Sequence, residues 1–105
     1  MYSKAELFNM ATEQPKEIFL NNVTLSIPGD AEGHVDLDAE TARLSHLWDV
    51  ARMPMGDMIT ATGMNITAFA KNAAIPYSSL QKWIRGEREC PVYVRFFLAD
   101  HYGLI

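Results

Sequence analysis

Residues 65–91 read NITAFAKNAAIPYSSLQKWIRGERECP, and this run determines the architecture expected for the whole C-terminal half. Asn65 is a favourable N-cap for a helix, and apolar residues recur behind it at helical spacing. These apolar residues are Ile66, Phe69, Ala70 and Ala73. A break at Ala74-Ile75-Pro76 precedes a second helix, from Tyr77 to Arg85, which Gly86 ends. The run therefore predicts two short helices joined by a tight turn.

The second of these helices has two unlike faces. Leu80, Trp83 and Ile84 stand at i, i+3 and i+4, so we expect them to pack inward. The opposite stripe is polar and cationic, and consists of Ser78, Gln81, Lys82 and Arg85. Glutamine can bond adenine in bidentate fashion, and lysine or arginine can bond guanine, when a helix lies in the major groove of DNA. The pattern is typical of a helix that reads DNA.

Helical patterns flank this pair on both sides. Upstream, the pattern begins at Asp38 and ends at Pro54, with an apolar face of Leu44, Leu47, Trp48 and Ala51. A further face of Met55, Met58, Ile59 and Thr62 is closed by Gly63. Downstream, Pro91 opens a helix through Val94, Phe97, Leu98 and His101. We therefore predict one helical domain over residues 38–105.

Residues 1–37 are expected to form a short N-terminal appendage. Ser3 and Glu6 make a capping-box pattern, which predicts a helix from Lys4 to about Thr12. The runs 17–20 and 23–27 are joined by Asn21-Asn22, which favours a two-residue β-hairpin. The expected fold class is mainly α: a bundle of about five helices containing a helix-turn-helix, with an appendage that holds the hairpin.

Residues of about 54–102 resemble the phage-repressor (Cro/CI, or XRE) type of helix-turn-helix family. The matching segments are Gly63–Lys71, Ile75–Trp83, and Gly86-Glu87-Arg88 with Pro91. Several spaced positions agree at once, among them Phe69-Ala70 in the first helix. Two positions depart from the family's pattern: Ile66 stands where glutamine is usual, and Ile84 where glutamate is usual.

The resemblance implies a transcriptional regulator of bacterial or phage origin, a repressor that binds double-stranded DNA as a homodimer. We expect the helix at 77–85 to lie in the major groove. The residues expected to read bases are Tyr77, Ser78, Gln81 and Lys82. The residues expected to hold phosphates are Asn65, Thr67, Lys71, Arg85 and Arg88.

The two halves of the chain differ in charge. The formal net charge is −4, but residues 1–50 carry three cations against nine acids, and residues 51–105 carry six cations against four acids. The acidic half could bind a protein partner. There are two alternatives to a DNA-binding repressor: an antitoxin whose acidic half masks a basic toxin, and a protein adaptor that has lost DNA binding.

The remaining candidates for chemistry point away from an enzyme. His34, Asp36 and Asp38 alternate, but three such ligands within five residues rarely close a metal site. Cys90 has no evident basic partner to activate it, and no Gly-rich phosphate loop is present. We expect no catalytic residue, cofactor or metal. The sequence has neither a membrane-spanning stretch nor a secretory signal pattern, which predicts a cytoplasmic protein with no membrane partner.

Overall fold

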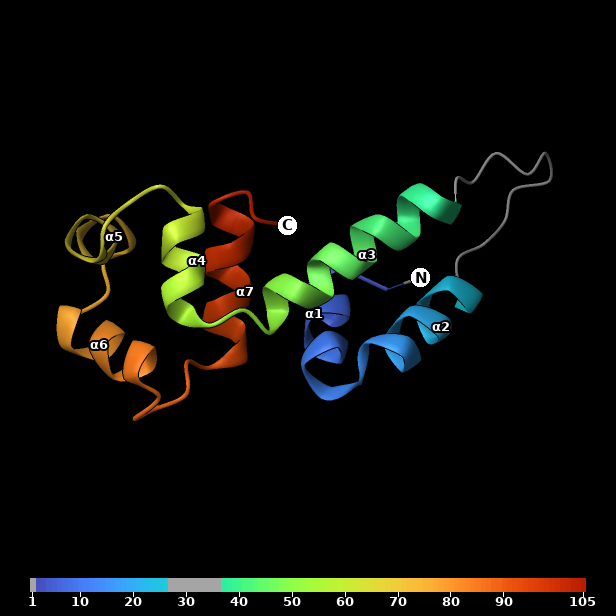
Figure 1. Cartoon of the computed structure of the whole chain (residues 1–105), viewed down its shortest axis with the longest axis horizontal. Helices are drawn as coiled ribbons and strands as arrows, with labels where there is room; N and C mark the ends of the chain where they lie inside the picture. The colour runs from blue at the N-terminus through green and yellow to red at the C-terminus, as the bar shows by residue number, and fades with distance from the viewer. Residues whose placement is uncertain (1, 27–36) are drawn as a thin grey trace. The chain divides into compact units, whose positions relative to one another are not determined.

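The computed structural model describes residues 2–26 and 37–105, and in this part of the chain it is mainly helical with no strand (Figure 1). The described residues form seven helices and two compact units, Met1–Arg52 and Met53–Ile105. The first unit holds α1 (Lys4–Glu13), α2 (Lys16–Ser26) and α3 (Leu37–Ala51). The second holds α4 (Met55–Ala61), α5 (Ile66–Ala73), α6 (Tyr77–Arg85) and α7 (Val92–His101). None of these helices is long and apolar enough to cross a membrane.

In the first unit, α3 packs against both α1 and α2. The predicted capping box at the start of α1 is confirmed: the Glu6 amide donates to Ser3 Oγ at 3.1 Å, and the Ser3 amide donates to Glu6 Oε1 at 3.2 Å. The buried side chains of this unit are Leu7, Phe8, Ala11, Phe19, Val23, Leu44, Leu47, Val50 and Ala51. All three helices therefore contribute to one apolar core.

The predicted β-hairpin is wrong, because its first run and its turn lie inside α2. Phe19 and Val23, one helical turn apart, are both buried, whereas Ile18 is 51% exposed. The buried residues of this segment are thus spaced as on one face of a helix, and not alternately as in a strand. Asn21-Asn22, the expected turn, lies on the exposed side of the helix. Residue 27, at the end of the second run, lies outside the described residues.

The helix count also differs from expectation. The described residues form seven helices instead of about five. The two compact units divide after Arg52, and α3 lies in the first of them because its apolar face packs against α1 and α2.

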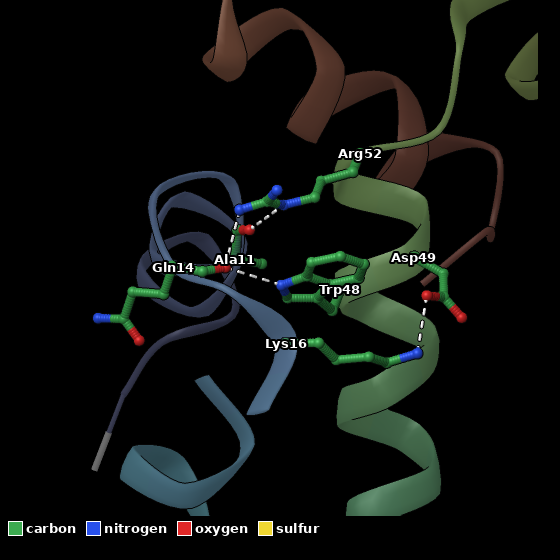
Figure 2. Close-up of polar contacts among 6 residues, drawn as sticks. All are labelled: Ala11, Gln14, Lys16, Trp48, Asp49 and Arg52. Carbon is green, nitrogen blue, oxygen red and sulfur yellow. Dashed lines mark hydrogen bonds and ion pairs between the residues drawn. The ribbon is translucent and has the colours of Figure 1, made fainter. Parts of the chain in front are cut away.

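A group of polar contacts joins the C-terminal end of α1 to the last turn of α3 (Figure 2). The indole Nε1–H of Trp48 donates to the Gln14 carbonyl at 3.0 Å. Arg52 donates from Nε to the Ala11 carbonyl at 2.9 Å and from a terminal nitrogen to the Gln14 carbonyl at 2.8 Å. The last carbonyls of a helix have no partner within the helix, so these donors satisfy them and fix α3 against α1.

In the second unit, α6 packs against both α4 and α5. The buried side chains of the second unit are Met55, Met58, Ile59, Phe69, Ala70, Leu80, Leu98 and Ala99. The chain after α7 is tied to α5, because the Tyr102 ring lies 5.3 Å from that of Phe69 and its hydroxyl donates to Asn72 Oδ1 at 2.6 Å. These residues form a second apolar core.

The turns of the second unit form where the sequence predicts them. The Asn65 side chain caps α5, accepting from the Ala68 amide at 2.8 Å. Gly63 follows α4 with φ of +80°, and Gly86 follows α6 with φ of +76°. At the end of α5, however, Ala74 adopts a left-handed conformation with φ of +56°. No local pattern predicts this conformation, because alanine is not a residue that favours positive φ.

Replacing Ala74 with glycine is expected to stabilise the second unit by about 1 kcal/mol, because glycine reaches the left-handed region without a Cβ clash. For a domain of this size, thermal melting followed by circular dichroism should rise by about 4–8 °C. Ala73→Gly is the matched control, since it places the glycine inside α5 and should destabilise the unit by about 0.5–1 kcal/mol. Equal shifts in the two variants would contradict the backbone explanation.

Candidate nucleic-acid interface

The turn between α5 and α6 is short and closed by backbone hydrogen bonds. The Ile75 amide donates to the Ala70 carbonyl at 3.0 Å, and the Leu80 amide donates to the Pro76 carbonyl at 3.2 Å. On either side of the turn, Phe69 and Leu80 are completely buried. The two helices are therefore held in a fixed relation by one core residue from each and by the backbone of the turn.

The outer face of α6 carries the polar stripe predicted from the sequence. Ser78, Lys82 and Arg85 are exposed at i, i+4 and i+7, and Gln81 lies beside them, half-buried. Arg85 lies 4.0 Å from Glu87 Oε1, an exposed contact that contributes little to stability. The stripe presents hydroxyl, amide and cationic groups on the side of α6 opposite Leu80.

The inner face of α6 is less enclosed than its spacing predicts. Leu80 is buried, but Trp83 is half-buried and Ile84 is 36% exposed. A Cβ atom at Gly56 of α4 would lie 4.0 Å from Ile84 Cγ2, so this side chain lies at the edge of the α4–α6 contact. Leu80 is therefore the one buried side chain of α6, and its two apolar neighbours remain partly open to solvent.

An open depression of about 430 Å³ lies where α5 meets α6. Ala70 and Ile75 give it an apolar lining, and Thr67, Lys71 and Tyr77 complete it. The structure thus brings together three of the predicted site residues, two from α5 and one from the start of α6. The depression itself is not evident from the sequence, because its lining comes from two helices and the turn between them.

The other two predicted phosphate-binding residues lie at helix ends. Asn65 uses its side-chain oxygen to cap α5, so that oxygen is already bonded. Arg88 is exposed just beyond α6, where the amides of Glu87 and Arg88 both donate to the Lys82 carbonyl, at 2.9 and 3.3 Å. The exit from α6 is therefore a closed turn that places the Arg88 backbone next to the last turn of the helix.

Arg95 differs from the other cations of this unit. It is partly buried on α7, donates to the Met53 carbonyl, and has its pKa lowered by burial. Burial also raises the pKa of the neighbouring Cys90 thiol to about 11, with an opposing influence from the charge of Arg95. At neutral pH this thiol is protonated, and a protonated thiol is a poor nucleophile.

The described residues contain no group of three His, Cys, Asp or Glu side chains that could hold a metal ion. Of the alternating residues considered as ligands, His34 and Asp36 lie outside the described residues, and Asp38 lies in the first turn of α3.

Searches with protein-family models, curated protein sequences and solved structures find no match to this chain, so a functional proposal rests on the residues described above.

Proposed function

We propose that this chain is a sequence-specific DNA-binding regulator of transcription, a repressor of bacterial or phage origin that acts in the cytoplasm. The observation that carries the proposal is the two-faced α6. Its buried Leu80 anchors the helix, and its opposite face exposes Ser78, Lys82 and Arg85. A helix that enters the major groove needs a fixed inner face and hydrogen-bonding groups on the outer one.

The positions of the polar and cationic side chains support a division between residues that read bases and residues that contact phosphates. Ser78, Gln81 and Lys82 are the residues proposed to reach base edges from the middle of α6, together with Tyr77 at its start. Lys71, on α5, and Arg85 and Arg88, at the end of α6, border this region and are the residues proposed to contact phosphates. Thr67 and the backbone amides at the start of α5, next to Asn65, are proposed to donate hydrogen bonds to DNA phosphates, as helix N-termini do.

The experiment that tests the proposal is selection of duplexes from a random-sequence pool by the full chain, followed by binding measurements on the selected duplex and its single-base variants. Gln81→Ala is expected to remove about 1–3 kcal/mol of discrimination at one base pair. Arg88→Ala is expected to weaken all sequences alike and to reduce the slope of log K against log salt by about one unit, because it loses one phosphate contact.

Two variants in the first unit provide matched controls. Asn22→Ala removes an exposed amide and Arg43→Ala removes an exposed guanidinium, and both should leave the specificity profile and the salt slope unchanged. Enrichment of no duplex above the starting pool would overturn the proposal and favour a protein adaptor. A Gln81→Ala variant with the wild-type profile would show that α6 does not lie in the groove as proposed.

We infer a homodimer, with α7 as the surface for the second copy. Tyr93 and Phe97 lie one turn apart on α7 and are 66% and 63% exposed. Phe97 also borders a depression of about 460 Å³ with Leu98, Asn72 and His101 among its lining residues. A protruding ring beside a hollow on the same face suits a two-fold contact, in which each copy presents both.

Sedimentation velocity of Phe97→Glu against wild type tests this surface. The variant is expected to sediment as a monomer, and an unchanged dimer would exclude α7 as the contact.

One observation favours a second candidate function, that of an antitoxin. The first unit exposes carboxylates on all three of its helices, and the described ones are Glu6, Glu13, Glu17, Asp38 and Asp49. Such a surface suits a basic protein partner. Co-expression with the product of a neighbouring gene for a small basic protein, followed by co-purification, separates an antitoxin from a repressor that acts alone.

A further inference from the structure

Tyr77 is an exposed aromatic residue next to the polar stripe of α6, and the polar character of the stripe does not account for it. It is the first residue of α6 and is 45% exposed. Its ring lines the depression at the α5–α6 junction, next to the apolar side chains of Ala70 and Ile75. An exposed aromatic ring on an otherwise polar helix face provides an apolar contact surface at the edge of the proposed DNA interface.

The residues near Tyr77 indicate which group of the DNA its ring can contact. Gln81 lies one helical turn along α6 from Tyr77, and Lys71 of α5 lines the same depression as Tyr77. A contact at Tyr77 therefore lies between a group suited to a base edge and a cation suited to a phosphate. In the major groove, the apolar group that bases present is the C5-methyl of thymine.

We propose that the Tyr77 ring contacts the C5-methyl group of a thymine in each half-site, while Lys71 holds a phosphate of the adjacent backbone. This inference rests on the proposed function and specifies one element of the DNA that the chain recognises. It assigns Tyr77 to apolar readout, where the phenolic hydroxyl is not needed. The operator is then required to carry thymine at that position.

Replacement of thymine by deoxyuridine tests the contact, because it removes the methyl group and leaves base pairing unchanged. Each thymine of a duplex selected by the full chain is replaced in turn. Wild type is expected to bind about three- to fourfold more weakly when the contacted thymine is replaced, as follows from burial of one methyl-sized group. Equal affinity for every substituted duplex would overturn the inference while leaving DNA binding intact.

Variants of Tyr77 connect the effect to this residue. Tyr77→Ala should bind the thymine and deoxyuridine duplexes equally at the sensitive position, whereas Tyr77→Phe should keep the wild-type difference. Tyr2→Ala is the matched control, because it removes an exposed tyrosine from the first unit and should also keep the difference. If Tyr77→Ala still discriminates against deoxyuridine, the inference is wrong. If the chain selects no duplex at all, the inference and the proposed function both fail.

Discussion

Phe69→Ala is expected to lower the free energy of unfolding of the second unit by about 3–5 kcal/mol. The Phe69 side chain is completely buried in α5, and its ring lies 5.3 Å from that of Tyr102. Truncation removes apolar contacts and leaves a cavity between α5 and the chain after α7. Small domains have a total stability of only about 5–15 kcal/mol, so the variant should be largely unfolded under mild denaturing conditions.

The two tryptophans allow each unit to be followed by itself, because Trp48 lies in the first and Trp83 in the second. In a Trp48→Phe background, Trp83 fluorescence during urea unfolding reports on the second unit alone. Phe97→Ala is the matched control, measured at a protein concentration low enough to keep the chain monomeric: it is the same substitution at a side chain that is 63% exposed in a single copy, and should cost far less. Equal unfolding midpoints for the two variants would contradict the assignment of Phe69 to the core.

The second unit could be predicted from the sequence because its signals are local. Asn65 caps α5, Gly63 and Gly86 take the positive φ that follows α4 and α6, and the apolar spacing of each segment matches a helix. A residue and its neighbours up to four positions away contain all of this information. The structure accordingly forms α5 and α6 over Ile66–Ala73 and Tyr77–Arg85, as expected.

In the first unit, α1 and α3 also follow from local signals, but α2 could not be predicted in the same way, because its decisive contacts join residues far apart in the chain. The alternation around Asn21-Asn22 favours a hairpin locally. Phe19 and Val23 are instead buried on one helical face of α2, which packs against α3. Where two local patterns compete, the partner that covers the apolar residues decides between them, and that partner lies beyond the local window.

The candidate site was predictable to a similar degree. Helical periodicity alone places Ser78, Lys82 and Arg85 on the outer face of α6, where the structure exposes them. The depression beside Tyr77 was not predictable, because its lining combines residues of α5, of the turn and of α6, whose packing no local pattern specifies. The partial exposure of Trp83 and Ile84 was missed for a related reason: spacing indicates which side a residue faces, and not how far the neighbouring helix extends to cover it.

Trp48→Ala is expected to lower the free energy of unfolding of the first unit by about 3 kcal/mol, the lower end of the range for tryptophan because the ring is only partly buried. The indole makes two kinds of contact, a hydrogen bond to the residue that ends α1 and ring contacts with cations of α2 and of the chain just after α3 (Figure 2). Its Nε1–H donates to the Gln14 carbonyl, and two cations lie near its ring, with the Arg52 guanidinium carbon 4.5 Å and Lys16 Nζ 5.4 Å from the centroid. Each cation contributes about 0.5–1 kcal/mol at such exposed sites.

Trp48→Phe separates the two contributions, because phenylalanine keeps an aromatic ring under Arg52 and removes the indole donor. Its expected cost is about 1–1.5 kcal/mol, the net value of a typical hydrogen bond. Both variants are measured by thermal melting with circular dichroism and by hydrogen exchange of the α1 and α3 amides. Asp49→Asn is the control, since it weakens the exposed 2.9 Å ion pair with Lys16 and should cost less than about 1 kcal/mol. Equal losses for Trp48→Ala and Trp48→Phe would show that the hydrogen bond to Gln14, and not the ring, is the contribution of Trp48 to the stability of the first unit.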